Sequence, residues 1–509
     1  MTEPEQGGAA HGGGEHDPKL SHATIRSRAM SGAALVAGRG VALLVLAVVA
    51  NAVLAHLLSP RQFGLVAFGL AIMTFASSLA DGGLGSALIR SSTPIDTPTL
   101  KSVFALELTV TTVLFVAIAV VSFPFFGLAG QLTALMALTL PLGSLTTPVT
   151  IVLERNLDYR VLARVELLQA LVYYSFSVTA VAAGLGVWGL ASATVVRTGV
   201  SVVLLYLARR DLFFLPLFSY TRIRPLLRFG LNFQATSFVN VVRDQGMNIG
   251  IAAIAGTATL GVWTLARRLL ELPMLLFQTL WRVSFPAMSQ LVRAGSDVRS
   301  LIERGAKVTS IGSGFVLATV AAASPGLVPA IFGGRWHEAG TVVPIACAGL
   351  LVPGPISVAT AGFLYAAGDA GSVLVATIAH TAVWLAVSLL LLPSLGVIAI
   401  PIGWVVGSAV DMIALASATY RHVPAKLFRS VARPTVAALA GGGAGILFSV
   451  LVGPSLWGGF ASALIALAVY SGLLLALERA ETAQLVTTML ASVRAASATP
   501  TPATAAEGS

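Results

Sequence analysis

The chain has 509 residues, of which 56% are hydrophobic and only 10% are charged, and its mean hydropathy is +0.88. Soluble domains carry about 25% charged residues, so this composition excludes a water-soluble globule of this size and indicates a chain that faces lipid. The formal net charge of +10 is typical of basic cytoplasmic loops in a membrane protein. We therefore expect the lipid bilayer, and no nucleic acid, as a partner.

Apolar segments long enough to cross a membrane follow one another along nearly the whole chain. A helix needs about 20 residues to span the hydrocarbon core, and about fourteen segments meet this length. They are expected at 33–57, 64–88, 102–124, 131–153, 163–185, 187–208, 229–255, 258–285, 308–332, 341–366, 371–393, 396–418, 435–455 and 457–477. The predicted fold class is an all-α polytopic membrane protein with about fourteen transmembrane helices.

The basic residues between the spans indicate how the chain lies in the membrane. If the N-terminus is inside, nearly all loop lysines and arginines fall on the cytoplasmic side, and the outer loops hold only Arg61 and Arg335. Cytoplasmic loops are enriched in these residues. We expect a multi-pass protein of the cell (inner) membrane with both termini in the cytoplasm.

The chain shows a weak internal repeat at a shift of 197 residues. Asn51 and Gly64 align with Asn248 and Gly261, at equivalent junctions between spans. Duplicated halves are a common plan among transporters, with the binding site at their interface. The expected units are a disordered cytoplasmic tail (1–30), a first lobe (31–210), a second lobe (211–420), two extra spans (421–477) and a mostly disordered cytoplasmic tail (478–509).

Several charged residues fall within the expected spans, where each needs a partner or a water-filled cavity. The candidates for substrate binding are Arg39, Arg243, Asp244, Arg267, Arg268 and Glu271. Arginines outnumber acids at mid-depth, which predicts a cationic central cavity, and a guanidinium holds phosphate through a two-pronged hydrogen-bond fork. Arg267 and Glu271 lie four residues apart and are able to pair on one helix face.

Other readings of the charged residues stay open. Arg243 and Asp244 also suit a structural ion pair, and Arg197 suits a residue that locks one helix to another. Asp81, with Gly82 and Gly83, suits a cap or hinge in a broken helix. Glu107, Asp411 and His380 suit structural roles in the core.

Span seven is unusually polar, and its polar residues recur at helical spacing. Ser237, Asn240, Asp244 and Asn248 follow one another at steps of three and four, which places them on one helix face. Such a face is expected to line water, although a polar seam packed against a neighbouring helix would give the same pattern. The candidates for the cavity lining are Asn232, Gln234, Asn240 and Asn248.

Cofactors and metals are not expected. A single cysteine, Cys347, excludes an internal disulfide and a cysteine-based metal site. No G-x-x-x-x-G-K-[ST] motif is present, so the chain itself offers no phosphate-binding loop for ATP.

The text LLSPRQFGLVAFGLAIMTFASSLADGGLGSALIR, with its Asp81–Gly85 turn, resembles the polysaccharide (O-antigen and exopolysaccharide) flippases of the multidrug/oligosaccharidyl-lipid/polysaccharide exporter superfamily. The stretches LERNLDYRVLARVELLQALV and RFGLNFQATSFVNVVRDQGMNIGIAAIAGTATLGVWTLARRLLELP are similar to later spans of that family. The resemblance covers roughly residues 31–310 and thins towards the C-terminus.

This resemblance implies two six-helix lobes around a central cavity, and alternating access without nucleotide hydrolysis. It implies that a polyprenyl-diphosphate-linked oligosaccharide is flipped to the outer leaflet, with Arg39 and Arg267 near the diphosphate or acidic sugars. A polysaccharide polymerase and glycosyltransferases of the same pathway would be further partners, and the chain would not be an enzyme. The alternatives are a drug or metabolite exporter of the same superfamily, or a membrane glycan polymerase or ligase.

Overall fold

The computed structural model describes Gly40, Leu43 and residues 45–90, 96–156, 158–293 and 297–478. Within these ranges, the side chains at 90, 227–237, 272, 279–280, 282–287 and 289–293 lie outside the description. Arg39, the expected N-terminal tail, the expected C-terminal tail beyond Glu478 and most of the start of the first expected span also lie outside it.

The described chain consists of helices joined by short connections. After a first helix over Val45–Leu57, the elements are α2 (Pro60–Asp81), α3 (Leu84–Arg90), α4 (Thr97–Phe125), α5 (Gly127–Ala137), α6 (Thr139–Ser144), α7 (Thr147–Arg155), α8 (Tyr159–Ala180), η1 (Val181–Leu185), α9 (Val187–Ala208), η2 (Arg210–Leu212), α10 (Tyr220–Arg293), α11 (Val298–Phe332), η3 (Gly334–Trp336), α12 (His337–Leu350), α13 (Pro353–Ala366), α14 (Ala370–Leu395), η4 (Gly396–Ile398), α15 (Ala399–His422), α16 (Leu427–Val452) and α17 (Leu456–Leu477).

The helices confirm the predicted polytopic fold. Among the described residues, ten helices are long and apolar enough to cross a membrane, or eleven if the bent pair α12 and α13 counts as one span. Two of these stretches hold two arms each: α10 turns at Gly256, where φ is 81°, and Ala370–His422 contains both α14 and α15. Each predicted span therefore corresponds to a helix, an arm of a helix or a run of consecutive helices.

Besides the span expected at 341–366, which is the bent pair α12 and α13, two other predicted spans are divided into separate helices. The span expected at 131–153 is divided into α5, α6 and α7, and Pro148 in the first turn of α7 lacks the N–H that would continue a helix from α6. The span expected at 64–88 is divided between α2 and α3 by Gly82 and Gly83, whose φ values of 51° and 76° favour glycine. The break gives the chain a bend next to Asp81.

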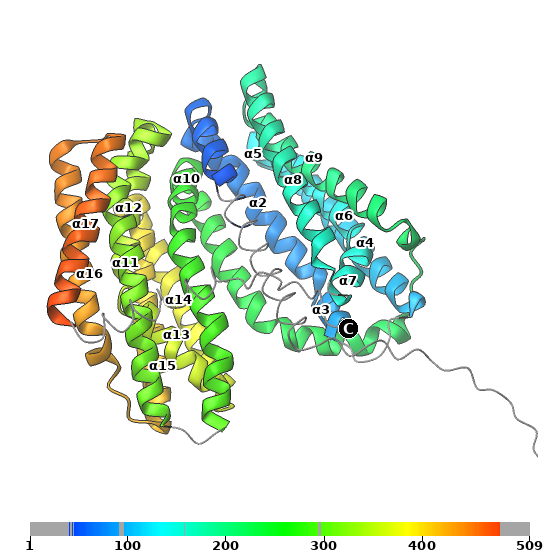
Figure 1. Cartoon of the computed structure of the whole chain (residues 1–509). Coiled ribbons are helices and arrows are strands. Elements are labelled where there is room, and N and C mark those ends of the chain that lie inside the picture. Colours follow the sequence, from blue (N-terminus) through cyan, green and yellow to red (C-terminus); the bar gives the residue numbers. More distant parts are fainter. Residues whose placement is uncertain are drawn as a thin grey trace, which may run out of the picture.

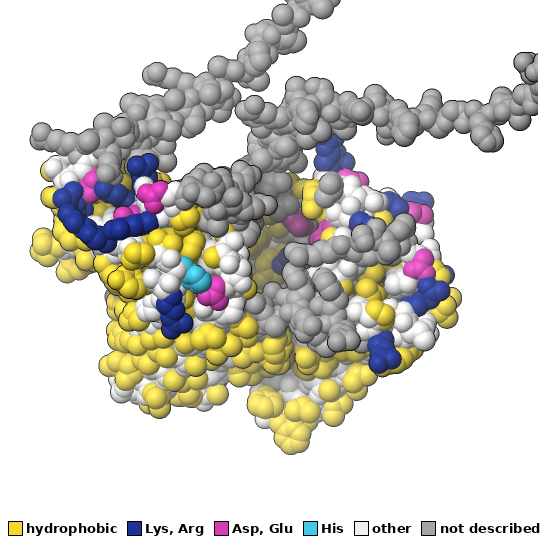
Figure 2. All heavy atoms as spheres, turned by 90° about the horizontal axis from the view of Figure 1, so that it is seen from below, with side chains coloured by type: hydrophobic (Ala, Val, Ile, Leu, Met, Phe, Trp, Pro, Cys, Tyr) yellow, Lys and Arg dark blue, Asp and Glu magenta, His cyan; other side chains and the backbone are white. Residues whose placement is uncertain are grey.

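The helices form two groups. Figure 1 shows α2 to α9 on one side, α11 to α17 on the other, and α10 between them. The helix ends that carry most of the described lysines and arginines, such as the end of α9 and the starts of α11 and α16, meet at one face. Figure 2 shows this face from below, with the Lys and Arg side chains gathered on it and apolar side chains on the flanks. We call it the charged face, and the opposite end, which carries the turn at Gly256, the outer end.

At the outer end, α2 packs directly against the second arm of α10. A Cβ on Gly64 would overlap the backbone oxygen of Thr257, and a Cβ on Gly261 would overlap the backbone oxygen of Pro60. The contact is reciprocal, because Pro60 and Thr257 are separated by the same 197 residues as Gly64 and Gly261. The two halves that share the weak sequence repeat thus meet across a local two-fold relation. Only glycine lets the two backbones approach this closely.

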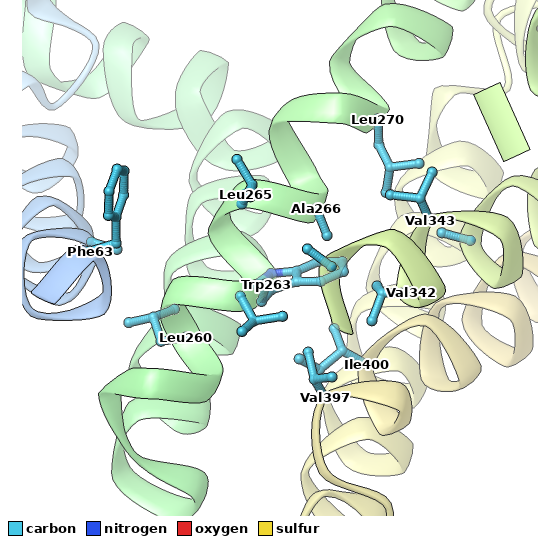
Figure 3. Packing of buried hydrophobic residues seen from close by; sticks show 14 of the residues in the cluster. Phe63, Leu260, Trp263, Leu265, Ala266, Leu270, Val342, Val343, Val397 and Ile400 are labelled. Carbon is cyan, nitrogen blue, oxygen red and sulfur yellow. The ribbon is translucent and has the colours of Figure 1, made fainter. Parts of the chain in front are cut away.

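Aromatic residues complete the packing at this end. The indole Nε1–H of the buried Trp336 donates to the Ala55 carbonyl oxygen at 3.1 Å, and the Phe63 ring meets Trp336 edge-on at 5.1 Å between centroids. Deeper in the same cluster, Figure 3 shows Trp263 of α10 among side chains that include Val342 and Ile400. The outer end of the interface is therefore closely packed.

Candidate functional site: two pockets at mid-depth

The arginines inside the helices lie at a similar depth below the outer turns. Arg197 follows Gly186 by about three turns of α9, and Arg267 and Arg268 follow Gly256 by about three turns of α10. Arg243 precedes Gly256 by a comparable distance on the other arm. At 1.5 Å per residue this depth is roughly 16–20 Å, near the middle of a bilayer.

Two pockets at this depth are lined by described residues. The first lies among α10, α12, α13, α14 and α15, and we call it the α10–α15 pocket. Its cavity volume is about 430 Å³. Its charged and polar lining residues are Arg243, Asp244, Arg267, Glu271, Gln278, Ser357, His380, Ser408 and Asp411, and its aromatic ones are Trp384 and Trp404. It therefore brings together four of the six predicted substrate-binding residues.

Asp244 is the centre of an ion-pair cluster in this pocket. Arg243 Nε donates to Asp244 Oδ1 at 2.9 Å, and Arg267 Nη2 donates to Asp244 Oδ2 at 2.6 Å. The Arg243 guanidinium also lies over the Trp384 ring, 5.8 Å from its centroid. The two arms of α10 are thus tied together across their turn. Both oxygens of the carboxylate, and one nitrogen of each guanidinium, are used inside the protein.

The remaining acids of the α10–α15 pocket balance its arginines. Glu271 interacts electrostatically with Arg267 and Arg268, but no ion pair within 4.0 Å joins it to a described residue. Asp411 lines the wall and accepts a hydrogen bond from Ser357 Oγ at 2.8 Å. Three carboxylates therefore share this pocket with two arginines, so the expected cationic character is not found here. The possible Arg267–Glu271 pair is replaced by Arg267–Asp244, because the fold brings the two arms of α10 together.

The second pocket lies among α2, α6, α8, α9 and α10, and we call it the α6–α9 pocket. Its cavity volume is about 350 Å³. It is lined by Leu70, Thr139, Gly143, Thr146, Gln169, Tyr173, Tyr174, Thr194, Arg197, Thr198, Ser201 and Arg268. This lining contains two arginines, several hydroxyl groups and one amide, and it contains no carboxylate.

Both arginines of the α6–α9 pocket make their close contacts with uncharged groups. Arg268 Nη1 donates to Asn51 Oδ1 on the first helix, and the Arg197 guanidinium lies 5.8 Å from the centroid of the Tyr173 ring. Among the described residues, no carboxylate lies within ion-pair distance of either guanidinium. Although Arg267 and Arg268 are adjacent in the sequence, they serve different pockets, because successive residues of a helix point about 100° apart.

The other predicted residues are placed as follows. Asn240 and Asn248 lie half-buried on α10, outside both pocket linings, and Asn248 Nδ2 donates to Gln245 Oε1 at 3.1 Å. The side chains of Asn232 and Gln234 lie outside the description, as does Arg39. Asp81, Gly82 and Gly83 lie at the break between α2 and α3.

Most of the residues that line the α6–α9 pocket were not among the predicted site residues. Arg197 was expected to lock helices together, yet its side chain is exposed on the pocket wall. A signal was present: Thr194, Arg197, Thr198 and Ser201 recur at steps of three, one and three, as one polar face of α9 requires. Gln169 and Tyr173 are four residues apart on α8 and form the facing wall. In the α10–α15 pocket, His380 and Asp411 were likewise expected to be structural and now appear in the lining.

Comparison with protein families gives a match over more than half of the chain. A family model described as "Polysaccharide biosynthesis protein" matches residues 53–341. This segment includes α2, the whole α6–α9 pocket and both arms of α10.

Two curated proteins are similar in sequence. The lipopolysaccharide biosynthesis protein WzxC of Escherichia coli (strain K12) is 26% identical over 343 residues, which cover 64% of this chain and 67% of WzxC. The succinoglycan biosynthesis transport protein ExoT of Rhizobium meliloti (strain 1021) is 24% identical over 312 residues, which cover 59% of this chain and 62% of ExoT. The chain thus matches about two thirds of the length of these relatives.

Solved structures share the fold. The lipid II flippase MurJ, in an inward closed conformation, superposes with a TM-score of 0.64 at 12% identity, over 87% of this chain and 98% of MurJ. An inward-facing multidrug resistance transporter of the MATE family in the MOP superfamily gives a TM-score of 0.55 at 17% identity, over 75% of this chain and 94% of that one. The fold is that of a multi-pass membrane transporter.

Proposed function

The chain belongs to the polysaccharide biosynthesis protein family, and we propose that it flips a lipid-linked oligosaccharide across the membrane for surface-polysaccharide biosynthesis. The observation that carries the proposal is a pair of polar, arginine-containing pockets at mid-depth in a membrane protein of this family. Charged groups are costly at this depth unless they serve a pathway for polar cargo. A glycan joined to a lipid through a diphosphate is polar cargo with a tail that remains in the bilayer.

The relatives support this function. WzxC is named as a lipopolysaccharide biosynthesis protein, ExoT as a succinoglycan biosynthesis transport protein, and MurJ as a lipid II flippase. All three names concern cell-surface glycans or their lipid-linked precursors. None of them names a hydrolase, ligase or polymerase, so a transporter is favoured over an enzyme.

The packing of the two helix groups supports transport by alternating access. The groups are sealed at the outer end by the Gly64 and Gly261 contact, and the polar pockets lie beneath that seal. In our proposal the cargo enters from the charged face, and the groups then separate at the outer end. The cargo is released to the outer leaflet.

We infer the orientation from the distribution of charge. The charged face faces the cytoplasm of a cell with an inner membrane, because cytoplasmic loops are enriched in lysine and arginine. Both termini are then cytoplasmic, and the cargo moves from the cytoplasmic to the outer leaflet. A polysaccharide polymerase and glycosyltransferases of the same pathway would act on either side of this step.

The test is the leaflet distribution of lipid-linked glycans in a strain that lacks this chain. We expect them to accumulate on the cytoplasmic leaflet, with surface polymer lost, and both effects to be reversed by the wild-type gene. Unpolymerised glycan on the outer leaflet would instead identify a polymerase. Unchanged lipid-linked glycans would contradict the proposal and favour a drug or metabolite exporter.

A matched pair of variants links this result to the fold. Gly261→Leu should insert in the membrane but fail to restore surface polymer, because the side chain would overlap the backbone of α2. Gly472→Ala should restore it fully, because a Cβ at position 472 meets no atom within 4 Å.

A further inference from the structure

We propose that the α6–α9 pocket, through Arg197 and Arg268, holds the anionic group of the cargo, and that the Arg243–Asp244–Arg267 cluster does not. The inference rests on the proposed function and deepens it by assigning the anion to one pocket. The shared chemistry is a phosphate or carboxylate group attached to a hydroxyl-rich molecule, as in a prenyl diphosphate or an acidic sugar.

The two pockets differ in the charge that they offer to a ligand. In the α10–α15 pocket, Asp244 already occupies both arginines at 2.9 and 2.6 Å, and two further carboxylates line the same wall. An incoming anion would have to displace an internal carboxylate and approach the others, which repel it. In the α6–α9 pocket, Arg197 and Arg268 face the cavity without a carboxylate in its lining. Glu271 interacts electrostatically with Arg268, but it lines the other pocket and forms no ion pair with Arg268 within 4.0 Å. The free positive charge is therefore in the α6–α9 pocket.

The α6–α9 pocket also offers many hydrogen-bonding groups. Besides the two guanidinium groups, its wall carries the hydroxyl groups of threonine, serine and tyrosine residues and the Gln169 amide. Guanidinium groups bind phosphate and carboxylate oxygens in pairs, and hydroxyl and amide groups bind sugar hydroxyls. Two aromatic rings, Tyr173 and Tyr174, lie in the same wall at 5.0 Å between centroids and offer apolar faces to a sugar ring.

The two arginines of the α6–α9 pocket come from helices in different parts of the molecule. Arg197 belongs to α9 in the first group of helices, whereas Arg268 belongs to the second arm of α10. Arg268 is held by Asn51 on the first helix, across the junction that the outer contact closes. An anion bound by both arginines would stabilise the arrangement in which α9 and α10 are close. It would lose one of its two arginines when these helices separate, which gives a physical reason for release.

The experiment measures direct binding to the purified full-length protein in lipid nanodiscs. The probe is farnesyl diphosphate, and farnesol is the neutral control with the same tail. We expect Arg197→Gln and Arg268→Gln each to weaken farnesyl diphosphate binding roughly tenfold or more, because each removes a charge-assisted hydrogen bond. Arg197→Lys and Arg268→Lys should retain part of the affinity, since the charge remains. Farnesol binding should not change in any variant.

Two control variants separate the pockets and exclude general effects of losing an arginine. Arg267→Gln removes a partner of Asp244 in the other pocket and should weaken the binding of farnesyl diphosphate much less than Arg268→Gln does. Arg335→Gln, in the exposed outer connection η3, should leave it unchanged. Thermal unfolding of each variant shows whether it is folded, and the lysine variants provide the reading if a glutamine variant is not.

A second probe identifies the source of the anion. A trimer of galacturonate carries carboxylate groups on sugars and no diphosphate. If the binding of farnesyl diphosphate depends on Arg197 and Arg268, the pocket is assigned to the diphosphate. If only the binding of the trimer depends on these two arginines, the pocket is assigned to acidic sugars. The proposal is overturned if wild type binds neither probe, if both arginines are dispensable for both probes, or if Arg267→Gln weakens binding as much as Arg268→Gln.

These outcomes are distinguishable from a failure of the proposed function. If the arginine-dependent binding is found but the deletion strain shows a normal leaflet distribution, the pocket stands and the flippase proposal fails. If the deletion strain accumulates cytoplasmic glycan lipid but binding ignores both arginines, the flippase proposal stands and this assignment fails.

Discussion

The helix α2 and the second arm of α10 occupy equivalent places in the two halves of the molecule, yet they differ with depth. At the outer end they are alike, with Gly64 and Gly261 in reciprocal contact. Two turns deeper, α2 carries Leu70 and Ala71 at the positions where α10 carries Arg267 and Arg268. The comparison teaches that the repeat supplies a symmetric scaffold for closure, while the chemistry of the cavity is asymmetric.

The largest effect is expected when the reciprocal glycine contact at the outer end is disrupted. Gly64→Leu or Gly261→Leu should destabilise the closed outer end by about 3 kcal/mol, because the new side chain overlaps a backbone carbonyl of the other helix. The reporter is Leu58→Cys, at a position that is 1% exposed, in a chain whose single cysteine is replaced by Cys347→Ala. We expect a membrane-impermeant maleimide to label this cysteine at least roughly tenfold faster in the leucine variants.

Gly472→Ala is the matched control, because nothing lies within 4 Å of its added Cβ. Equal labelling in the control and the leucine variants would show that the two helices are not the closure.

The next largest effect is expected at Asp244, and it tests the difference in charge between the two pockets. Asp244→Asn should lower the free energy of unfolding by about 2 kcal/mol, because two partly buried arginines lose their shared carboxylate. It should also give the α10–α15 pocket an affinity for farnesyl diphosphate, so that a second binding site appears in titrations. Asp211→Asn makes the same chemical change in an exposed ion pair, which water screens, and should leave the thermal unfolding nearly unchanged.

An unchanged number of farnesyl diphosphate sites in the folded Asp244→Asn variant would contradict the inference that Asp244 keeps the arginines of the α10–α15 pocket from binding an anion. Thermal unfolding followed by tryptophan fluorescence measures the loss of stability in the same samples.

The smallest effect concerns one hydrogen bond at the outer end. Trp336→Phe removes the Nε1–H that donates to the Ala55 carbonyl and should destabilise the closed form by about 1 kcal/mol. Labelling of Leu58→Cys should then rise severalfold. Trp457→Phe, at a position that is 84% exposed, should not change it. An equal rise in both variants would mean that the hydrogen bond is irrelevant to closure.

Much of the fold was predictable from the sequence, because span length, apolar character and turn residues are local properties. The turns at Gly184, Gly256 and Gly396 lie within two residues of the gaps between predicted spans, and each of these glycines has a positive φ. The further division of the span at 131–153 was not predicted, since an apolar segment with prolines is compatible with either a kinked or a divided helix.

The candidate site was less predictable, because pairing depends on which helices meet. The sequence indicates that Arg243, Asp244 and Arg267 lie in the membrane, but not that the two arms of α10 bring Arg267 to Asp244. It places Arg267 and Arg268 side by side, whereas the fold sends them to different pockets. Charge counts along the chain therefore predicted one cationic cavity, where the structure has a balanced pocket and a cationic one.

The most direct test of the account is the transbilayer movement of a lipid-linked oligosaccharide in proteoliposomes made with the purified chain. The lipid is first placed in both leaflets, and the fraction accessible to a membrane-impermeant glycosidase is followed with time. We predict that the wild-type chain makes nearly all of the lipid accessible, that Arg268→Gln slows this step, and that Gly472→Ala matches the wild type. Accessibility that stops at the outer-leaflet fraction with folded wild-type protein, as in protein-free vesicles, would contradict the account.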